Sequence, residues 1–218
     1  MPAYSRRSRS SLLAVATPLI EAARRLRPEP LVREAADTAD LARLELEAAL
    51  RGRRSAGVDL SAAVAGALAA EASLDRRVLA LARALDGLAE LGDGDAEAAR
   101  DRLFPAGARA LVQPTGRAQV PEYTLLADGL AALRGDPALE RLAPYPDALR
   151  ADLLAFTAAL SEKEGVRSDA RGAVVSVNGA AEALRDALQQ LDRAVELTCG
   201  GAGAAGYAAW AAASQGLG

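Results

Sequence analysis

The fold is decided by residues 149–198, which read LRADLLAFTAALSEKEGVRSDARGAVVSVNGAAEALRDALQQLDRAVELT. Two series of positions step by seven residues through this stretch and keep one phase across the polar residues 161–172. The first series contains Leu149, Phe156, Lys163, Ala170, Val177, Leu184, Leu191 and Thr198, and the second contains Leu153, Leu160, Arg167, Val174, Ala181, Leu188 and Val195. A hairpin loop would have no reason to preserve this register. The spacing therefore favours one helix of about 50 residues over 147–198.

Three glycines keep a second interpretation open, because Gly165, Gly172 and Gly179 fall inside the same stretch. Each glycine costs about 1 kcal/mol in a helix interior, and Glu164-Gly165 is typical of a helix C-terminus. Two antiparallel helices joined near residue 165 are the alternative. In the single-helix interpretation, we expect the polar middle to be exposed to solvent.

The first half of the chain has a second heptad pattern. Its repeating positions are Leu60, Ala67, Leu74, Leu81 and Leu88. This pattern predicts a helix that begins at Asp59 or Ser61 and ends near Leu91. Residues 51–57, RGRRSAG, are interpreted as a break after an earlier helix over about 30–54. That earlier helix has a mostly alanine side, which favours close contact between helices.

Residues 105–121 lack helical spacing and form an irregular loop in this interpretation. Within them, Pro114-Thr-Gly116 is a turn signal between two short arms, which predicts a small β-hairpin at about 109–120. The fold class expected for the whole chain is all-α, an antiparallel bundle of long helices in one domain over 12–198. Residues 1–11 form a basic N-terminal arm, and residues 199–218 form a Gly/Ala-rich C-terminal segment.

Composition limits the chemistry that the chain can perform. It contains no histidine, the commonest metal ligand and general base, and about a quarter of its residues are alanine, the best helix former. The net charge of −3 comes from 29 acidic and 26 basic residues mixed along the chain, so nucleic acid is an unlikely partner. Arginine replaces lysine almost everywhere, which is typical of coding bias in a GC-rich, bacterial genome.

Solubility and location follow from the same reading. Arg, Glu or Asp interrupts each helical stretch before it reaches the roughly 18 apolar residues that span a bilayer, so we expect no membrane span. Cys199 is the only cysteine, so no intramolecular disulfide can form. A lone cysteine suits a reducing compartment, and we expect a cytoplasmic protein.

A binding site, if the chain has one, is expected in residues 104–123, because irregular loops on rigid scaffolds carry most recognition residues. The donors and the aromatic ring there are Arg109, Gln113, Arg117, Gln119 and Tyr123. They would suit an anionic small molecule or a peptide. The competing interpretation is a solvated linker between two helical halves.

Three more residues are candidates for interaction. Glu71 falls on the heptad seam, where a carboxylate must be paired, exposed at an edge, or have a functional role. Asp75 lies one turn away. Tyr207 and Trp210 lie one turn apart in a short helix over about 204–214. They dock either on their own bundle or on a neighbouring subunit.

The function expected from these patterns is that of a non-catalytic structural or protein-interaction protein, which self-associates or binds a protein partner. No motif for a nucleotide, a metal or an activated nucleophile occurs, so we expect no catalytic residue, cofactor or metal site. The first alternative is a binding module for an anionic ligand through residues 104–123. The second is an enzyme of unrecognised type that uses Glu71.

Overall fold

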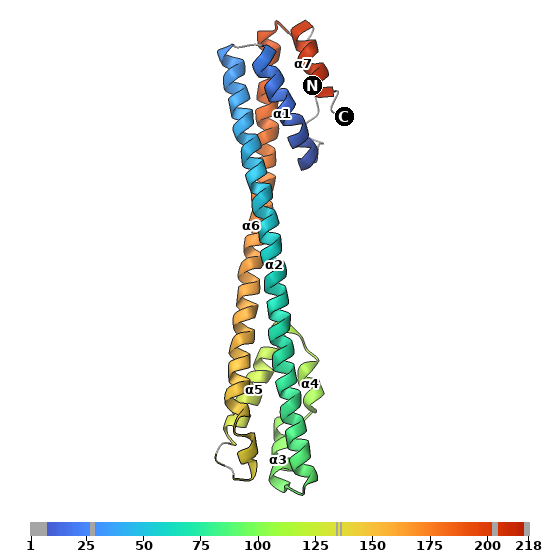
Figure 1. The fold of residues 1–218 in the computed structure, drawn as a ribbon, viewed down its shortest axis with the longest axis vertical. Helices are drawn as coiled ribbons and strands as arrows, with labels where there is room; N and C mark the ends of the chain where they lie inside the picture. The colour runs from blue at the N-terminus through green and yellow to red at the C-terminus, as the bar shows by residue number, and fades with distance from the viewer. Residues whose placement is uncertain (1–7, 27–28, 134, 136, 202–204, 216–218) are drawn as a thin grey trace. The chain divides into compact units, whose positions relative to one another are not determined.

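The computed structural model describes residues 8–26, 29–133, 135, 137–201 and 205–215. Every regular element in these ranges is helical, and the long helices α2 (Pro30–Glu90) and α6 (Tyr145–Thr198) run in opposite directions (Figure 1). The predicted all-α bundle with long helices is confirmed. The chain forms two compact units: unit 1 contains residues 1–57 and 169–218, and unit 2 contains residues 58–168. The predicted limits of a single bundle domain stay predictions.

Helix α6 is one uninterrupted helix of 54 residues, as the heptad phase predicts. None of its residues 161–176 is buried, which confirms the expected exposed middle. The three glycines do not break it. No heavy atom outside the local backbone lies within 4 Å of a Cβ built at Gly165, Gly172 or Gly179.

Helix α2 is also uninterrupted, over 61 residues, so the predicted break at 51–57 is wrong. The physical reason lies in the heptad phase. Val32, Ala39 and Leu46 are buried, and steps of seven continue from them through the exposed Arg53 to the seam at Leu60 and Ala67. A turn at Gly52 or Gly57 would have shifted this phase, and both glycines sit in open space where a helix tolerates them.

Unit 1 is built from α1 (Arg9–Leu26), α7 (Ala205–Gln215) and the adjoining parts of α2 and α6. Residues 1–7 of the predicted basic arm lie outside the described residues, whereas residues 9–11 already belong to α1, which contains Pro18. The core of unit 1 is made of alanine and aliphatic side chains from α1, α2 and α6, together with Trp210 and Tyr207 of α7.

Unit 2 contains α3 (Gly94–Leu103), α4 (Ala108–Val112), α5 (Val120–Ala131) and the 3-10 helices η2 (Gly116–Gln119) and η3 (Pro137–Leu142). These short elements pack against the adjoining parts of α2 and α6. Their shared core has a smaller share of alanine than that of unit 1, and its aromatic side chains are Phe104, Tyr123 and Phe156.

The predicted β-hairpin at 109–120 is wrong, because these residues form α4, η2 and the start of α5, and the described residues contain no strand. The two arms consist mainly of alanine, leucine, arginine and glutamine, which prefer helix, with Val112 and Val120 as their only β-branched residues. The chain bends at Gln113 and Pro114, before η2 begins. Gly116 then takes a φ of 66°, which few residues other than glycine adopt.

Helix α2 ends at a glycine turn, and Asp93 starts α3. Gly92 has a φ of 85°, and the Asp93 backbone N–H donates to the Leu88 carbonyl oxygen at 3.3 Å, which closes the last turn of α2. The Asp93 carboxylate then accepts from the backbone N–H groups of Asp95 and Ala96, both at 3.1 Å.

The expectation that charged residues interrupt every potential span needs correction. Helix α2 is long and apolar enough to cross a membrane by length and composition alone. Residues 57–74 carry only two charges, Asp59 and Glu71, and seven of the other positions are alanine. This is weak evidence for a span, since each carboxylate at the centre of a membrane helix costs several kcal/mol.

Candidate functional site

The structure joins Glu71 and Asp75 of α2 to the segment 116–123 in a polar cluster inside unit 2. The Tyr123 hydroxyl donates to Asp75 Oδ1, and Gln119 Nε2 lies 3.3 Å from the Tyr123 hydroxyl. The Gly116 backbone N–H donates to Glu71 Oε1 at 2.7 Å. Glu71 is therefore paired on the seam, through a backbone group that the sequence did not identify.

The chemistry of this polar cluster is that of a structural clamp. Tyr123 and Gln119 are fully buried, and burial, followed by the bond to Asp75, raises the pKa of the Tyr123 hydroxyl well above its usual value. Tyr123 thus stays protonated as a donor. The cluster fixes η2 and α5 to α2, and one buried acceptor, Gln119 Oε1, has no hydrogen-bond partner among the described residues.

The structure does not gather the five loop residues that the sequence singled out. Arg109 and Gln113 are exposed, and the Arg117 guanidinium pairs with the Glu164 carboxylate at 2.7 Å. Gln119 and Tyr123 are buried and face Asp75 instead. An anionic ligand held by these five side chains stays a prediction.

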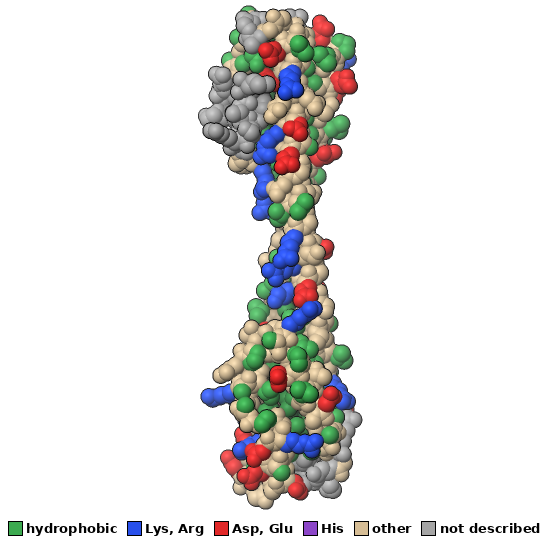
Figure 2. Space-filling view, turned by 180° about the vertical axis from the view of Figure 1, so that it is seen from behind, with side chains coloured by type: hydrophobic (Ala, Val, Ile, Leu, Met, Phe, Trp, Pro, Cys, Tyr) green, Lys and Arg blue, Asp and Glu red, His purple; other side chains and the backbone are tan. Residues whose placement is uncertain are grey.

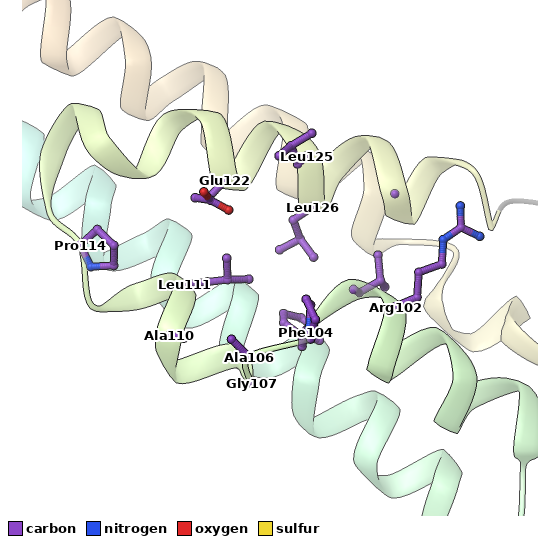
Figure 3. A pocket seen from close by; sticks show the side chains of 13 residues that line it. Arg102, Phe104, Ala106, Gly107, Ala110, Leu111, Pro114, Glu122, Leu125 and Leu126 are labelled. Atoms are coloured by element: carbon purple, nitrogen blue, oxygen red, sulfur yellow. The ribbon is translucent and has the colours of Figure 1, made fainter.

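A cavity of about 550 Å³ lies beside the predicted loop in unit 2, between α3, α4 and α5 (Figure 3). Its lining is mostly apolar and includes Phe104, Leu111 and Leu126, with one cation, Arg102, and one carboxylate, Glu122. The cavity lies beside the segment that the sequence singled out, but its lining contains none of the five predicted side chains. The apolar lining residues look like ordinary core positions when only the spacing is known.

Tyr207 and Trp210 dock α7 onto its own unit. Trp210 is fully buried, and its Nε1–H donates to the carbonyl oxygen of Leu19 in α1 at 3.3 Å. The Tyr207 hydroxyl donates to Oδ1 of the buried Asp192 at 3.0 Å. Of the two alternatives for this aromatic pair, the structure describes docking on the chain itself.

This docking predicts a loss of stability at high pH. Burial and the bond to Asp192 raise the pKa of Tyr207 to about 12 in the folded protein. The unfolded chain releases this proton near pH 10, so the contribution of Tyr207 is complete below pH 10 and declines up to about pH 12. At about 1.4 kcal/mol per pKa unit, the total decline is on the order of 3 kcal/mol.

Urea unfolding followed by tryptophan fluorescence measures this decline, because Trp210 is the only tryptophan. We expect the midpoint to fall between pH 10 and 12 in the natural chain, and to fall less in Tyr207→Phe, where only the buried Tyr123 still loses its contribution. Burial also raises the pKa of Asp192, so its contribution falls from about pH 3.8 upward and is constant at alkaline pH. Equal pH dependence in the two chains would contradict the assignment.

A second candidate site lies on the surface of unit 1, where α2 and α6 line two open hollows of about 360 and 600 Å³. We call the two hollows together the open groove. The lining residues on each helix include positions spaced seven residues apart, which places both hollows on one face of the helix pair. The α2 wall contains Leu31, Thr38, Glu45 and Gly52, and the α6 wall contains Ser176, Ala183, Gln190 and Leu197.

Alanine forms the floor of the open groove. Ala35 and Ala194 line the smaller hollow, Ala49 and Ala180 line the larger one, and heptad steps place the buried Ala42 and Ala187 between them. This register sets Ala42 opposite Ala187. Small side chains there let the two helices lie close together, as the alanine pattern around residues 35–49 predicts.

Large aliphatic side chains border this floor without any cover. Leu31 and Leu197 line the smaller hollow and are 51% and 74% exposed, and Leu41, outside the lining of both hollows, is 64% exposed. Leu41 lies on the same face of α2, three residues after Thr38 and four before Glu45. On the face drawn in Figure 2, acidic and basic side chains occur in both units, in keeping with the mixed charge of the sequence.

Comparisons with protein-family models, with curated proteins and with solved structures find no match for this chain.

Proposed function

We propose that this chain is a non-catalytic, cytoplasmic assembly protein that self-associates through the helical surface of unit 1. The observation that carries the proposal is the open groove, where exposed leucines border an alanine floor. The fold of a single chain gains nothing from leucines at the surface, whereas an interface between helices would bury them away from water. The alanine floor supports the same function, because close-packed helices present a smooth face to another helix.

The polar cluster in unit 2 supports a structural role over a catalytic one. Its carboxylates are engaged with a backbone N–H and with a tyrosine that stays protonated. A general base must be free to take a proton from a substrate, and an acid must release one near neutral pH. Tyr123 meets neither condition, because its hydroxyl stays protonated and is bonded to Asp75.

Leu41→Asp tests this function. A carboxylate in the centre of an apolar interface would remain without a partner, so we expect the variant to be monomeric at concentrations where the natural chain associates. Light scattering after size-exclusion chromatography gives the masses. The matched control is Leu154→Asp in unit 2, which changes an equally exposed leucine, 71% accessible, outside the groove. Equal masses for all three chains would contradict the proposal.

The cavity in unit 2 favours a second candidate function, the binding of an apolar molecule that carries an anionic group. Its volume falls in the usual range for ligand pockets, its lining is mostly apolar, and Arg102 supplies one cation. Anilinonaphthalene sulfonate is a probe with this chemistry. We expect its fluorescence to rise with the natural chain and to stay low with Ala110→Trp, which fills the cavity. Ala98→Trp, at an exposed position outside the lining, is the control.

A further inference from the structure

Building on the proposed self-assembly, on which this step depends, we infer that the open groove of unit 1 is occupied by the same groove of a second copy, arranged antiparallel. A two-fold axis lies over Ala42 and Ala187. Helix α2 then packs on the partner's α2, and α6 packs on the partner's α6.

The shape of the groove is self-complementary in this arrangement. One end carries the exposed Leu31 and Leu197, whereas the other is the larger hollow of about 600 Å³. Apart from Glu45, no side chain larger than serine lines that hollow; the lining residues are Ala48, Ala49, Gly52, Ala173, Ser176, Gly179, Ala180 and Ala183. An antiparallel partner brings its leucines to the hollow, and each copy fills the other.

Position along the helices supports the same axis. The midpoint between Leu31 and Gly52 lies at residues 41–42, next to the Ala42–Ala187 pair of the floor. Leu41, 64% exposed, therefore meets its own copy beside the axis.

The positions of two charged residues on α6 give the same axis independently. Arg193 and Glu182 are exposed, lie three turns apart on one face of α6, and have no described ion pair. Residues halfway between them are Ala187 and Leu188, so the axis again passes over Ala187. The antiparallel arrangement then places Arg193 of each copy on Glu182 of the other.

The area is sufficient for a reversible dimer. From residue 31 to 52 a helix rises about 32 Å, and two helices are about 20 Å wide, so each copy would bury about 600 Å². The total of about 1,200 Å² is at the lower end of stable, specific interfaces. The two Asp186 carboxylates would also lie near the axis and repel each other, which again points to a weak dimer.

Cysteine cross-linking tests the arrangement in chains that carry Cys199→Ala, so that no native thiol remains. We expect Leu41→Cys to form a disulfide-linked dimer, because a two-fold axis brings position 41 close to itself. Leu31→Cys should not link to itself, yet it should link to Gly52→Cys when the two chains are mixed. A disulfide needs Cα atoms within about 7 Å, so misplaced pairs cannot react without rearrangement. Cross-linking of Leu31→Cys to Leu197→Cys instead would overturn the antiparallel arrangement.

Charge reversal gives a second readout that needs no covalent bond. Arg193→Glu alone is expected to weaken the dimer at least about tenfold, and Arg193→Glu with Glu182→Arg to restore it to within about threefold. The control reverses Arg83 and Glu90, two exposed residues of α2 in unit 2, and should leave the dissociation constant unchanged.

The outcomes separate the two levels of the argument. A natural chain that stays monomeric rejects the proposed function and this inference together. If the natural chain dimerises but the Leu41→Cys variant forms no disulfide-linked dimer, only the antiparallel groove is rejected. The same holds if the double reversal fails to restore the dimer.

Discussion

Trp210→Ala is expected to lower the free energy of unfolding by about 3–5 kcal/mol, the usual cost of replacing a buried aromatic ring by a methyl group. The indole is fully buried, its N–H donates to the Leu19 carbonyl oxygen, and its ring centroid lies 6.0 Å from that of Tyr207. The variant leaves a cavity between α1 and α7 and removes the indole's hydrogen bond to the helix carbonyl. Urea unfolding followed by circular dichroism at 222 nm, about the usual wavelength for helix, measures the loss.

The size of this effect decides where α7 belongs. Leu154→Ala, at an exposed position, serves as the control and should change stability by less than about 0.5 kcal/mol. If Trp210→Ala were equally mild in dilute solution, α7 would not be docked on its own unit. The alternative of docking on a neighbouring subunit would then regain support.

Alanine at four helix-interior glycines is expected to stabilise the protein by about 2–4 kcal/mol in total, or about 0.5–1 kcal/mol at each site. The positions are Gly57 and Gly66 in α2, and Gly165 and Gly172 in α6. A Cβ at any of them meets no atom within 4 Å, so alanine gains helix propensity without a clash. Thermal melting of the fourfold variant, compared with the natural chain, measures the gain.

The sign of that change tests the continuity of the two long helices. A turn at Gly57 or Gly165 would require a backbone conformation that alanine disfavours, and the substitution would then destabilise. Gly92→Ala and Gly200→Ala are the matched controls, because these residues have φ values of 85° and 81°. We expect each control to cost about 1–2 kcal/mol. Destabilisation by Gly165→Ala would favour the two-helix alternative.

Heptad phase carried most of the information about this fold. It identified α6 as one helix, because two apolar series kept step across polar residues. The same test applies to α2, where Val32, Ala39 and Leu46 share the phase of Leu60 and Ala67. The glycines and arginines of residues 51–57 outweighed that phase in the sequence interpretation. Local propensity is a weak guide when a long seam fixes the register.

The candidate sites were harder to predict because they depend on contacts between distant residues. The position of Glu71 on the seam signalled a paired carboxylate, yet its partner, the Gly116 N–H, is 45 residues away. Gln119 looks like an exposed loop residue in the sequence and is fully buried in the structure. The open groove had a visible signal, the heptad spacing of Leu31, Thr38, Glu45 and Gly52. Apolar periodicity does not reveal it, because the series mixes large, small and charged side chains.

Sedimentation equilibrium of the natural chain tests the central claim, self-assembly through unit 1, most directly. Across about 1–200 µM, the range expected for an interface of this size, the average mass should rise from 22.4 kDa toward twice that value. A mass that stays at 22.4 kDa over the whole range would contradict the claim.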